Sequence, residues 1–273
     1  MADKVVKNKK TVAKTSHAPS KINVYGIDGK VAGEAKLPEI FAAEYRPDLI
    51  RRAVTAMEAN ARQPYGPKST AGSRHSVSTW GKGRGVARVQ RLMGSSRAAQ
   101  SPNNVGGRRA HPPRVDKDYS KKINKKELLK ARLAALHATS VLEIVRTRGH
   151  QFGDELTVPV VVKNDLEAIK TTKEAVEVLS SIGVYEDVER AKNGRKIRAG
   201  RGKMRGRKYR NPRGPLVVLS SECDGGRSIR NLAGIEVVTP KALNVSILAP
   251  GGDPGRLMVI SESALDEIGR WGT

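Results

Sequence analysis

Two stretches of this chain contain many basic residues and no acidic residue. Residues 61–115 hold eleven Lys and Arg and residues 190–215 hold twelve, whereas the rest of the chain is close to neutral. Almost all of the formal net charge of +24 therefore lies in these two stretches. Like charges at this density repel one another and oppose a compact core. We expect both stretches to be insertions on an ordinary folded domain, with a polyanionic partner that removes the repulsion.

Nucleic acid is the leading partner, because its phosphates give a large, salt-dependent binding term. An anionic membrane surface is the alternative, but it requires a basic amphipathic helix, and both stretches are too rich in Gly and Pro to form one. No apolar run approaches the roughly 18 residues that span a bilayer, so we expect no membrane partner. Residues 1–14 lack the apolar region of a signal peptide. Residues 1–20 form a basic N-terminal extension to which the sequence assigns no role.

The near-neutral parts, residues 21–60 and 116–273, predict one globular α/β domain. Alternation from Ile22 to Leu37 around Asp28-Gly29 predicts an N-terminal β-hairpin. Pro47 opens a helix that reaches Asn60. A second helix starts at Asn124, with Glu127 three residues later, and should run through Leu129 to a stop near Gly149.

The second half alternates short aliphatic runs with helical segments. The runs, expected as strands, are residues 158–162, 216–219, 235–238 and 257–260. Between and after them, helices are predicted from the Thr171–Glu174 capping box to Gly183, from Pro240 to Leu243 and after a Ser261 cap, and residues 228–232 are predicted to form a short helix or a turn. This rhythm predicts a mostly parallel four-stranded sheet flanked by helices, in Rossmann-like order, with the hairpin, the long loop 61–115 and the insert 190–215 added to it.

Signatures of enzyme chemistry are missing. The chain has no P-loop, no Gly-x-Ser-x-Gly elbow and no His-Glu-x-x-His, and the glycines at 81–85 follow no predicted strand. A lone Cys223 excludes internal disulfides and a cysteine-rich zinc site. An RNA-modifying or RNA-processing enzyme with basic insertions is the competing hypothesis, but its candidate carboxylates, Asp165, Glu222 and Asp224, have no partner motif. We predict no enzymatic activity, no catalytic residue, no metal site and no cofactor.

The composition of the basic stretches suits RNA. Glycine lets the backbone turn sharply and come close to phosphates. Arginine grips a phosphate through two nitrogens and also stacks on bases. Tyr65, His75 and Trp80 add flat surfaces for unpaired bases, and Tyr209 does so in the second stretch. We expect the long loop to become ordered only on RNA.

Four long motifs carry a resemblance to a known family. They are WGKGRGVARVQR at 80–91, GGRRAHPPR at 106–114, GRGKMRGRKYRNPRGP at 200–215 and LNVSILAPGGDPGRLMVISESAL at 243–265. In this order they resemble the universal large-subunit ribosomal protein number four, with the archaeal and eukaryotic branch the closer match. The resemblance covers nearly the whole chain, although residues 1–20 depart from the short start that is usual in the family.

The resemblance implies a structural constituent of the large ribosomal subunit, in the cytoplasm, that binds large-subunit rRNA and supports assembly. Its expected partners are rRNA, neighbouring ribosomal proteins including another tunnel-lining protein, and the nascent peptide in passing; no homo-oligomer is expected. In this family the long loop reaches the nascent-peptide exit tunnel. The tip should fall near residues 74–97, with Arg74, Trp80, Lys82 and Arg84 closest to the tunnel.

The same comparison assigns rRNA contacts along both basic stretches. In the long loop these are Arg88, Arg91, Arg97, Arg108, Arg109, His111 and Arg114, together with the four tip residues. In the second insert they are Arg198, Arg201, Lys203, Arg205, Arg207, Lys208, Arg210 and Arg213.

Overall fold

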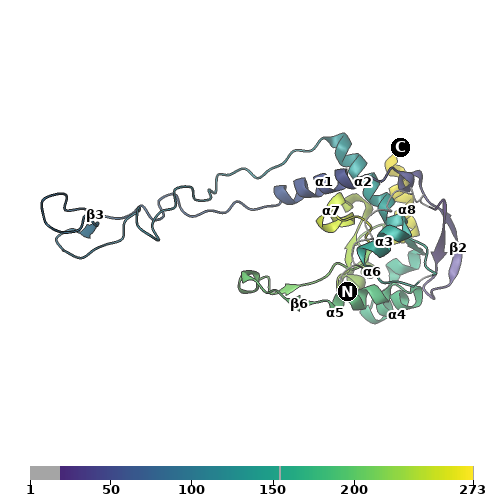
Figure 1. Ribbon diagram of the computed structural model, residues 1–273. Coiled ribbons are helices and arrows are strands. Elements are labelled where there is room, and N and C mark those ends of the chain that lie inside the picture. Colours follow the sequence, from purple (N-terminus) through teal and green to yellow (C-terminus); the bar gives the residue numbers. More distant parts are fainter. Residues whose placement is uncertain (1–18, 154, 273) are drawn as a thin grey trace, which may run out of the picture. The chain divides into compact units, whose positions relative to one another are not determined.

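A computed structural model describes residues 19–153 and 155–272 of the chain (Figure 1). The chain forms two compact units. Among these residues, the α/β unit comprises 19–57, 122–153 and 155–272, and the loop unit comprises Glu58–Lys121. Most of the predicted N-terminal extension, residues 1–18, lies outside the described residues.

One six-stranded sheet forms the centre of the α/β unit. Its order is β2 (Val31–Lys36), β1 (Lys21–Tyr25), β5 (Val160–Val162), β10 (Met258–Ser261), β8 (Leu216–Val218) and β9 (Glu236–Val238). All neighbours are parallel except the β1–β2 hairpin. The predicted hairpin is thus confirmed, but it is part of the sheet, because Val24 and Tyr25 pair with Val161 and Val162. The prediction of a four-stranded sheet was wrong, because the sheet has six strands.

The Rossmann-like strand order was also wrong. The last strand in the sequence, β10, lies between β5 and β8. All four of its residues are buried, whereas the residues of the edge strand β9 are only half-buried. A strand that is apolar on both faces gains most in the middle of a sheet that helices cover on both sides.

Two helices replace the single helix predicted from Asn124 to Gly149. Helix α2 (Lys125–Ser140) follows an Asn124 cap, and α3 (Leu142–Arg148) ends at a left-handed Gly149. Val141 between them is extended. The Thr139 and Ser140 hydroxyls donate to the carbonyls of Leu136 and His137, at 2.7 and 2.8 Å. Such local bonds compete with the helix and favour a break.

The remaining helices agree with the sequence in part. The predicted α1 (Pro47–Asn60), α4 (Thr172–Ile182) with its capping box, and α8 (Glu262–Gly269) with its Ser261 cap are all present. The short helix or turn predicted at 228–232 overlaps the end of α6 (Asp224–Arg230), and the helix predicted at 240–243 is a 3-10 turn (Pro240–Ala242) followed by α7 (Val245–Leu248). Helix α5 (Tyr185–Asn193) was not predicted. Further 3-10 turns are Glu39–Ala42, Asn164–Ala168, Pro250–Gly252 and Arg270–Gly272.

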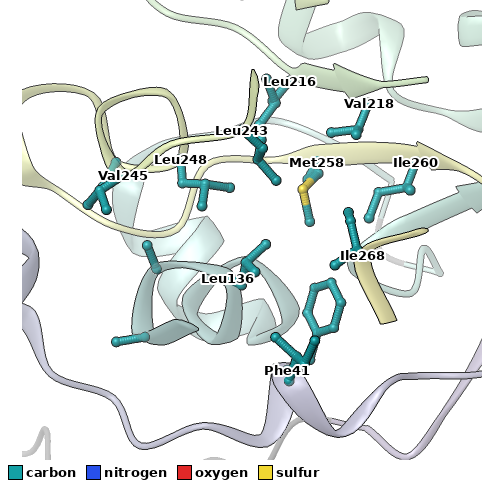
Figure 2. Packing of buried hydrophobic residues seen from close by; sticks show 14 of the residues in the cluster. Phe41, Leu136, Leu216, Val218, Leu243, Val245, Leu248, Met258, Ile260 and Ile268 are labelled. Atoms are coloured by element: carbon teal, nitrogen blue, oxygen red, sulfur yellow. The ribbon is translucent and has the colours of Figure 1, made fainter. Parts of the chain in front are cut away.

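Buried apolar clusters cover both faces of the sheet. Leu216, Val218, Met258 and Ile260 face one cluster, which α1, α2, α7 and α8 complete (Figure 2). Their neighbours along the strands, Val217, Leu219 and Val259, face the other cluster, with α4 and α6. This alternation is the period of two expected of a strand. It makes the α/β unit a three-layered scaffold from which the second basic insert projects.

Candidate nucleic-acid interface

The loop unit is a doubled chain, and its two arms run side by side (Figure 1). At its base, the Asn60 side chain donates to the Lys121 carbonyl at 3.3 Å and accepts from its amide at 2.8 Å. Further along, a Cβ on Gly66 would lie 2.5 Å from the Pro113 oxygen, so the arms approach more closely than another residue type permits. Near the tip, β3 (Val77–Ser78) pairs antiparallel with β4 (Arg91–Leu92). These contacts join the arms without a sheet along their length.

The loop unit has no hydrophobic core of its own. Across residues 58–121, all of which the structure describes, Ser101 alone is buried. Large apolar side chains are exposed instead, namely Tyr65, Val86, Val89, Leu92, Met93, Val105 and Val115. Because little apolar surface is buried, we expect the unit to need a partner for order.

Trp80 organises the tip. The guanidinium carbon of Arg84 lies 5.5 Å from the centroid of the Trp80 ring, and that of Arg91 lies 5.0 Å from it. Both distances are within the range of a cation–π interaction. Arg91 also donates to the carbonyls of Ser96 and Ala87. Trp80 and Arg91 are accordingly half-buried. Trp80 and Arg91 were both predicted to bind RNA, but their contact with each other was missed, because it depends on the antiparallel pairing of β3 with β4.

The other predicted residues of the long loop point into solvent. They are Arg74, Lys82, Arg84, Arg88, Arg97, Arg108, Arg109, His111 and Arg114, and each is exposed. Residues 61–115 contain no carboxylate that could pair with them. The loop unit therefore presents unpaired cations along both arms, which is the electrostatic footprint of a nucleic-acid surface.

The second insert is a short β-hairpin, which the sequence did not predict. Strand β6 (Lys196–Ile197) pairs with β7 (Tyr209–Arg210), and the tip is a 3-10 turn (Arg201–Met204). The Arg195 guanidinium stacks on the Tyr209 ring, with 4.1 Å between its carbon and the ring centroid, and so covers one face of that ring. The predicted contacts Arg198, Arg201, Lys203, Arg205, Arg207, Lys208 and Arg210 are all exposed.

Arg213 has a partner within the α/β unit. Its guanidinium donates to Glu236 of β9 at 3.3 Å, and its carbonyl accepts from Arg190 at 2.8 Å. The fully buried Arg256 also binds Glu236, at 2.8 Å, and donates to the neighbouring Gly214 carbonyl. Arg213 thus fastens the base of the hairpin to the edge of the sheet. Arg190, the first residue of the predicted insert, lies in α5.

A buried cluster holds Arg190 in place. The fully buried Asp187 accepts from His150 Nδ1 at 2.9 Å, from the Gln151 amide at 3.1 Å and from Arg190 Nε at 2.7 Å. Burial alone would raise the pKa of Asp187, but the bonds from His150 and Arg190 outweigh it and leave the pKa below its usual value. Burial lowers the pKa of His150 despite Asp187. Through Arg190, which also donates to the Arg213 carbonyl, the cluster anchors the base of the second insert.

The carboxyl ends of the parallel strands, where α/β enzymes bind ligands, hold a structural network. Glu167 accepts from the Ser220 amide and hydroxyl and from the Ser261 hydroxyl, at 2.7 to 2.9 Å. Burial would raise the pKa of Glu167, but these bonds lower it overall. The network ties the ends of β8 and β10 together. Sequence reasoning missed Glu167 and named Asp165, Glu222 and Asp224, which are all exposed.

The described part of the chain offers neither a metal site nor a membrane-spanning helix. No group of three or more His, Cys, Asp or Glu residues there could hold a metal ion. Among the same residues, no helix combines the length and the apolar character needed to cross a membrane.

Comparison with known proteins gives a consistent result. The pattern of the ribosomal protein L4/L1 family matches residues 35–271, which include both basic segments. The large ribosomal subunit protein uL4 of Methanosphaera stadtmanae is 47% identical over 250 residues, covering 92% of this chain and 96% of the relative. The uL4 proteins of Archaeoglobus fulgidus and Methanothrix thermoacetophila are 48% and 49% identical, over 92% and 89% of this chain and 99% and 96% of the relatives. The chain therefore belongs to the ribosomal protein L4/L1 family.

Proposed function

We propose that this chain is a structural protein of the large ribosomal subunit that binds large-subunit rRNA and supports assembly of the subunit. The observation that carries the proposal is the loop unit, whose exposed cations have no carboxylate between residues 61 and 115 and no hydrophobic core beneath them. Relatives that match nearly the whole chain are named as large-subunit proteins. Membership of a ribosomal protein family agrees with the prediction that the chain is not an enzyme.

Binding rests on charge neutralisation and on shape. Exposed arginines on both arms grip phosphates, and their charges repel each other less once the RNA is bound. The narrow doubled loop fits between RNA helices, where it contacts the backbone and stacked bases rather than base edges. The hairpin Lys196–Arg210 adds a second basic surface, held at its base by Arg190 and Arg213.

The tip of the long loop is proposed to reach the nascent-peptide exit tunnel, opposite another tunnel-lining protein. Arg74, Trp80, Lys82 and Arg84 are the residues assigned to the tunnel wall, on the basis of the family resemblance. The clamp of Arg84 and Arg91 on Trp80 supports this assignment, because it gives the tip a defined shape. The nascent peptide would meet these residues in passing, in ribosomes of the cytoplasm.

Sedimentation of a cell lysate at low and then high salt tests the ribosomal role. The chain should comigrate with the large subunit through several hundred millimolar salt, because loosely held basic proteins dissociate as counterions compete. Its absence from ribosomal fractions at low salt would contradict the proposal.

Cross-linking tests the tunnel assignment separately. Ribosomes stalled in translation, with p-benzoylphenylalanine in place of Lys82, should form adducts with the nascent chain on irradiation. The same substitution at Arg205, in the tip of the second insert, is the matched control and should give rRNA adducts only. Adducts at position 82 with rRNA alone would contradict tunnel proximity and leave the ribosomal role standing.

A further inference from the structure

A small apolar groove lies in the α/β unit between the end of α1, the first half of α2 and the start of α7. It is lined by Met57, Lys125, Leu128, Leu129, Arg132, Asn244 and Val245. Its volume of 260 Å³ is below the range of about 300–1,000 Å³ that holds small-molecule ligands. The groove has room for one anchoring side chain rather than for a metabolite.

Helix α2 presents one continuous face to this groove. Lys125, Leu128, Leu129 and Arg132 follow the spacing i, i+3, i+4, i+7, which brings them onto one side of a helix. Leu129, which lies on this face, is 50% exposed. A single exposed leucine is ordinary, but here it adjoins a concave apolar surface that can receive an apolar side chain of a partner.

Arg132 places a guanidinium at the edge of the groove. Its guanidinium stacks 3.7 Å from the Trp271 ring, and its buried Nε has no hydrogen-bond partner among the described residues. Burial lowers its pKa, and no carboxylate compensates. Arginine stacked on tryptophan is rigid and only partly hydrated, and such residues often dominate binding energy at protein interfaces.

The charges around the groove select the kind of partner. Two cations, Lys125 and Arg132, line it, and no carboxylate does. The nearby Glu127 is bound to Arg52 at 3.3 Å. An RNA phosphate would match the cations, but it would leave the apolar floor of Met57, Leu128 and Val245 without a partner. A protein segment that carries an aliphatic side chain next to a carboxylate matches both features.

We propose that this groove docks an acidic, amphipathic segment of another protein of the large subunit. One aliphatic side chain fills the groove, and an adjacent carboxylate binds Arg132 and Lys125. The inference rests on the proposed function, since assembly into the subunit brings the partner to this surface.

Photo-cross-linking in assembled large subunits tests the inference. Subunits containing the chain with Leu129→p-benzoylphenylalanine are irradiated, and adducts are identified by mass spectrometry. The expected result is one dominant protein adduct, at a segment with Asp or Glu within one helical turn of the labelled residue. An adduct with rRNA, adducts spread over unrelated proteins, or no adduct would each overturn the inference.

Charge reversal supplies the matched control. Adding Arg132→Glu should reduce the protein adduct about five- to tenfold, because it replaces attraction by repulsion. Lys130→Glu, on the same helix but outside the groove, should leave the yield within about twofold. If Arg132→Glu prevents assembly, Lys125→Glu takes its place. An unchanged yield with the reversal would overturn the role of the cations.

A label in the long loop separates this inference from the proposed function. Met93 is 82% exposed, and p-benzoylphenylalanine at this position should cross-link to rRNA in the same subunits. A chain that neither enters subunits nor labels rRNA from Met93 refutes the ribosomal role itself. Labelling from Met93 without the acidic protein adduct from Leu129 refutes the docking site alone.

Discussion

The protonation of one buried residue, His150, couples stability to pH. Its pKa in the folded chain is lowered by burial, so the unfolded chain, with an ordinary histidine pKa near 6.5, binds protons first as the pH falls. The neutral His150 side chain therefore contributes fully to the free energy of unfolding above about pH 6.5, and this contribution is lost as the pH falls below that value. The Asp187 carboxylate does not titrate in this window, because its pKa is lowered.

We therefore predict that the free energy of unfolding declines between pH 7.5 and 5.5, and that His150→Asn removes part of the decline. Asn keeps a donor for the Asp187 carboxylate at nearly the position of Nδ1, and it does not titrate in this range. Urea unfolding at several pH values measures the difference. Identical pH slopes for the two proteins would contradict the assignment of the effect to His150.

A second residue, Gly29, is fixed by the turn that it forms. Its φ is +75°, and a Cβ there would lie 2.2 Å from the Ser181 carbonyl oxygen. We predict that Gly29→Ala lowers the free energy of unfolding by about 2–4 kcal/mol, through strain and displacement of α4. Gly33→Ala, where no atom lies within 4 Å, is the control and should change it by less than about 0.5 kcal/mol. Equal effects in urea unfolding would show that the contact with Ser181 is unimportant.

Among the elements, the long loop and the central strands differ most in what holds them together. Strands β8 and β10 are buried at every residue, whereas the loop unit joins its arms through a few backbone and side-chain contacts. Local opening is governed by such differences in burial and hydrogen bonding.

We predict that amides of residues 66–113 exchange with solvent within seconds in the free chain, while those of β8 and β10 stay protected for far longer. Hydrogen exchange measured by mass spectrometry tests this prediction. Addition of large-subunit rRNA should protect the loop, because the RNA supplies the missing partner. Strong protection of residues 74–109 without RNA would contradict it.

For the whole molecule, the division into two units makes the long loop removable. The close approach of Gly66 and Pro113 lets a short Gly-Ser link replace residues 67–112, together with nine basic residues. The α/β unit should keep its free energy of unfolding within about 1 kcal/mol, because the loop unit adds no buried core.

The same deletion should weaken the salt dependence of rRNA binding. If all nine cations contact phosphates, the slope of log K against log salt concentration falls in magnitude by about 6–8. Filter binding to large-subunit rRNA at several salt concentrations measures the slope. A variant with Gln in place of Arg201, Lys203, Arg205 and Arg207 serves for comparison. Its slope should fall in magnitude by about 3–4 at most. An unchanged slope after loop deletion would show that the loop does not bind RNA phosphates.

Interactions between near neighbours in the sequence could be predicted. The Asp28-Gly29 turn, the Thr171–Glu174 capping box and the Ser261 cap each depend on a few adjacent residues, and each is present. The segregation of charge and the long motifs likewise need no folding to be seen, and they predicted the family that the comparisons show. Which residues contact RNA stays a prediction.

Tertiary structure decided whatever depends on residues far apart in the sequence. The insertion of β10 between β5 and β8, the joining of the hairpin to the sheet and the tie from Arg190 to Arg213 all involve distant partners. From the sequence, Arg91 and Arg213 were predicted to contact RNA like the other arginines. Composition cannot distinguish an exposed guanidinium from one that contacts Trp80 or Glu236 within the fold. Sequence alone determined where the charge lies and which local elements form. Only long-range packing determined the strand order and which charges remain free. A charged side chain binds whichever group the completed fold places beside it, and that group is often far away in the sequence.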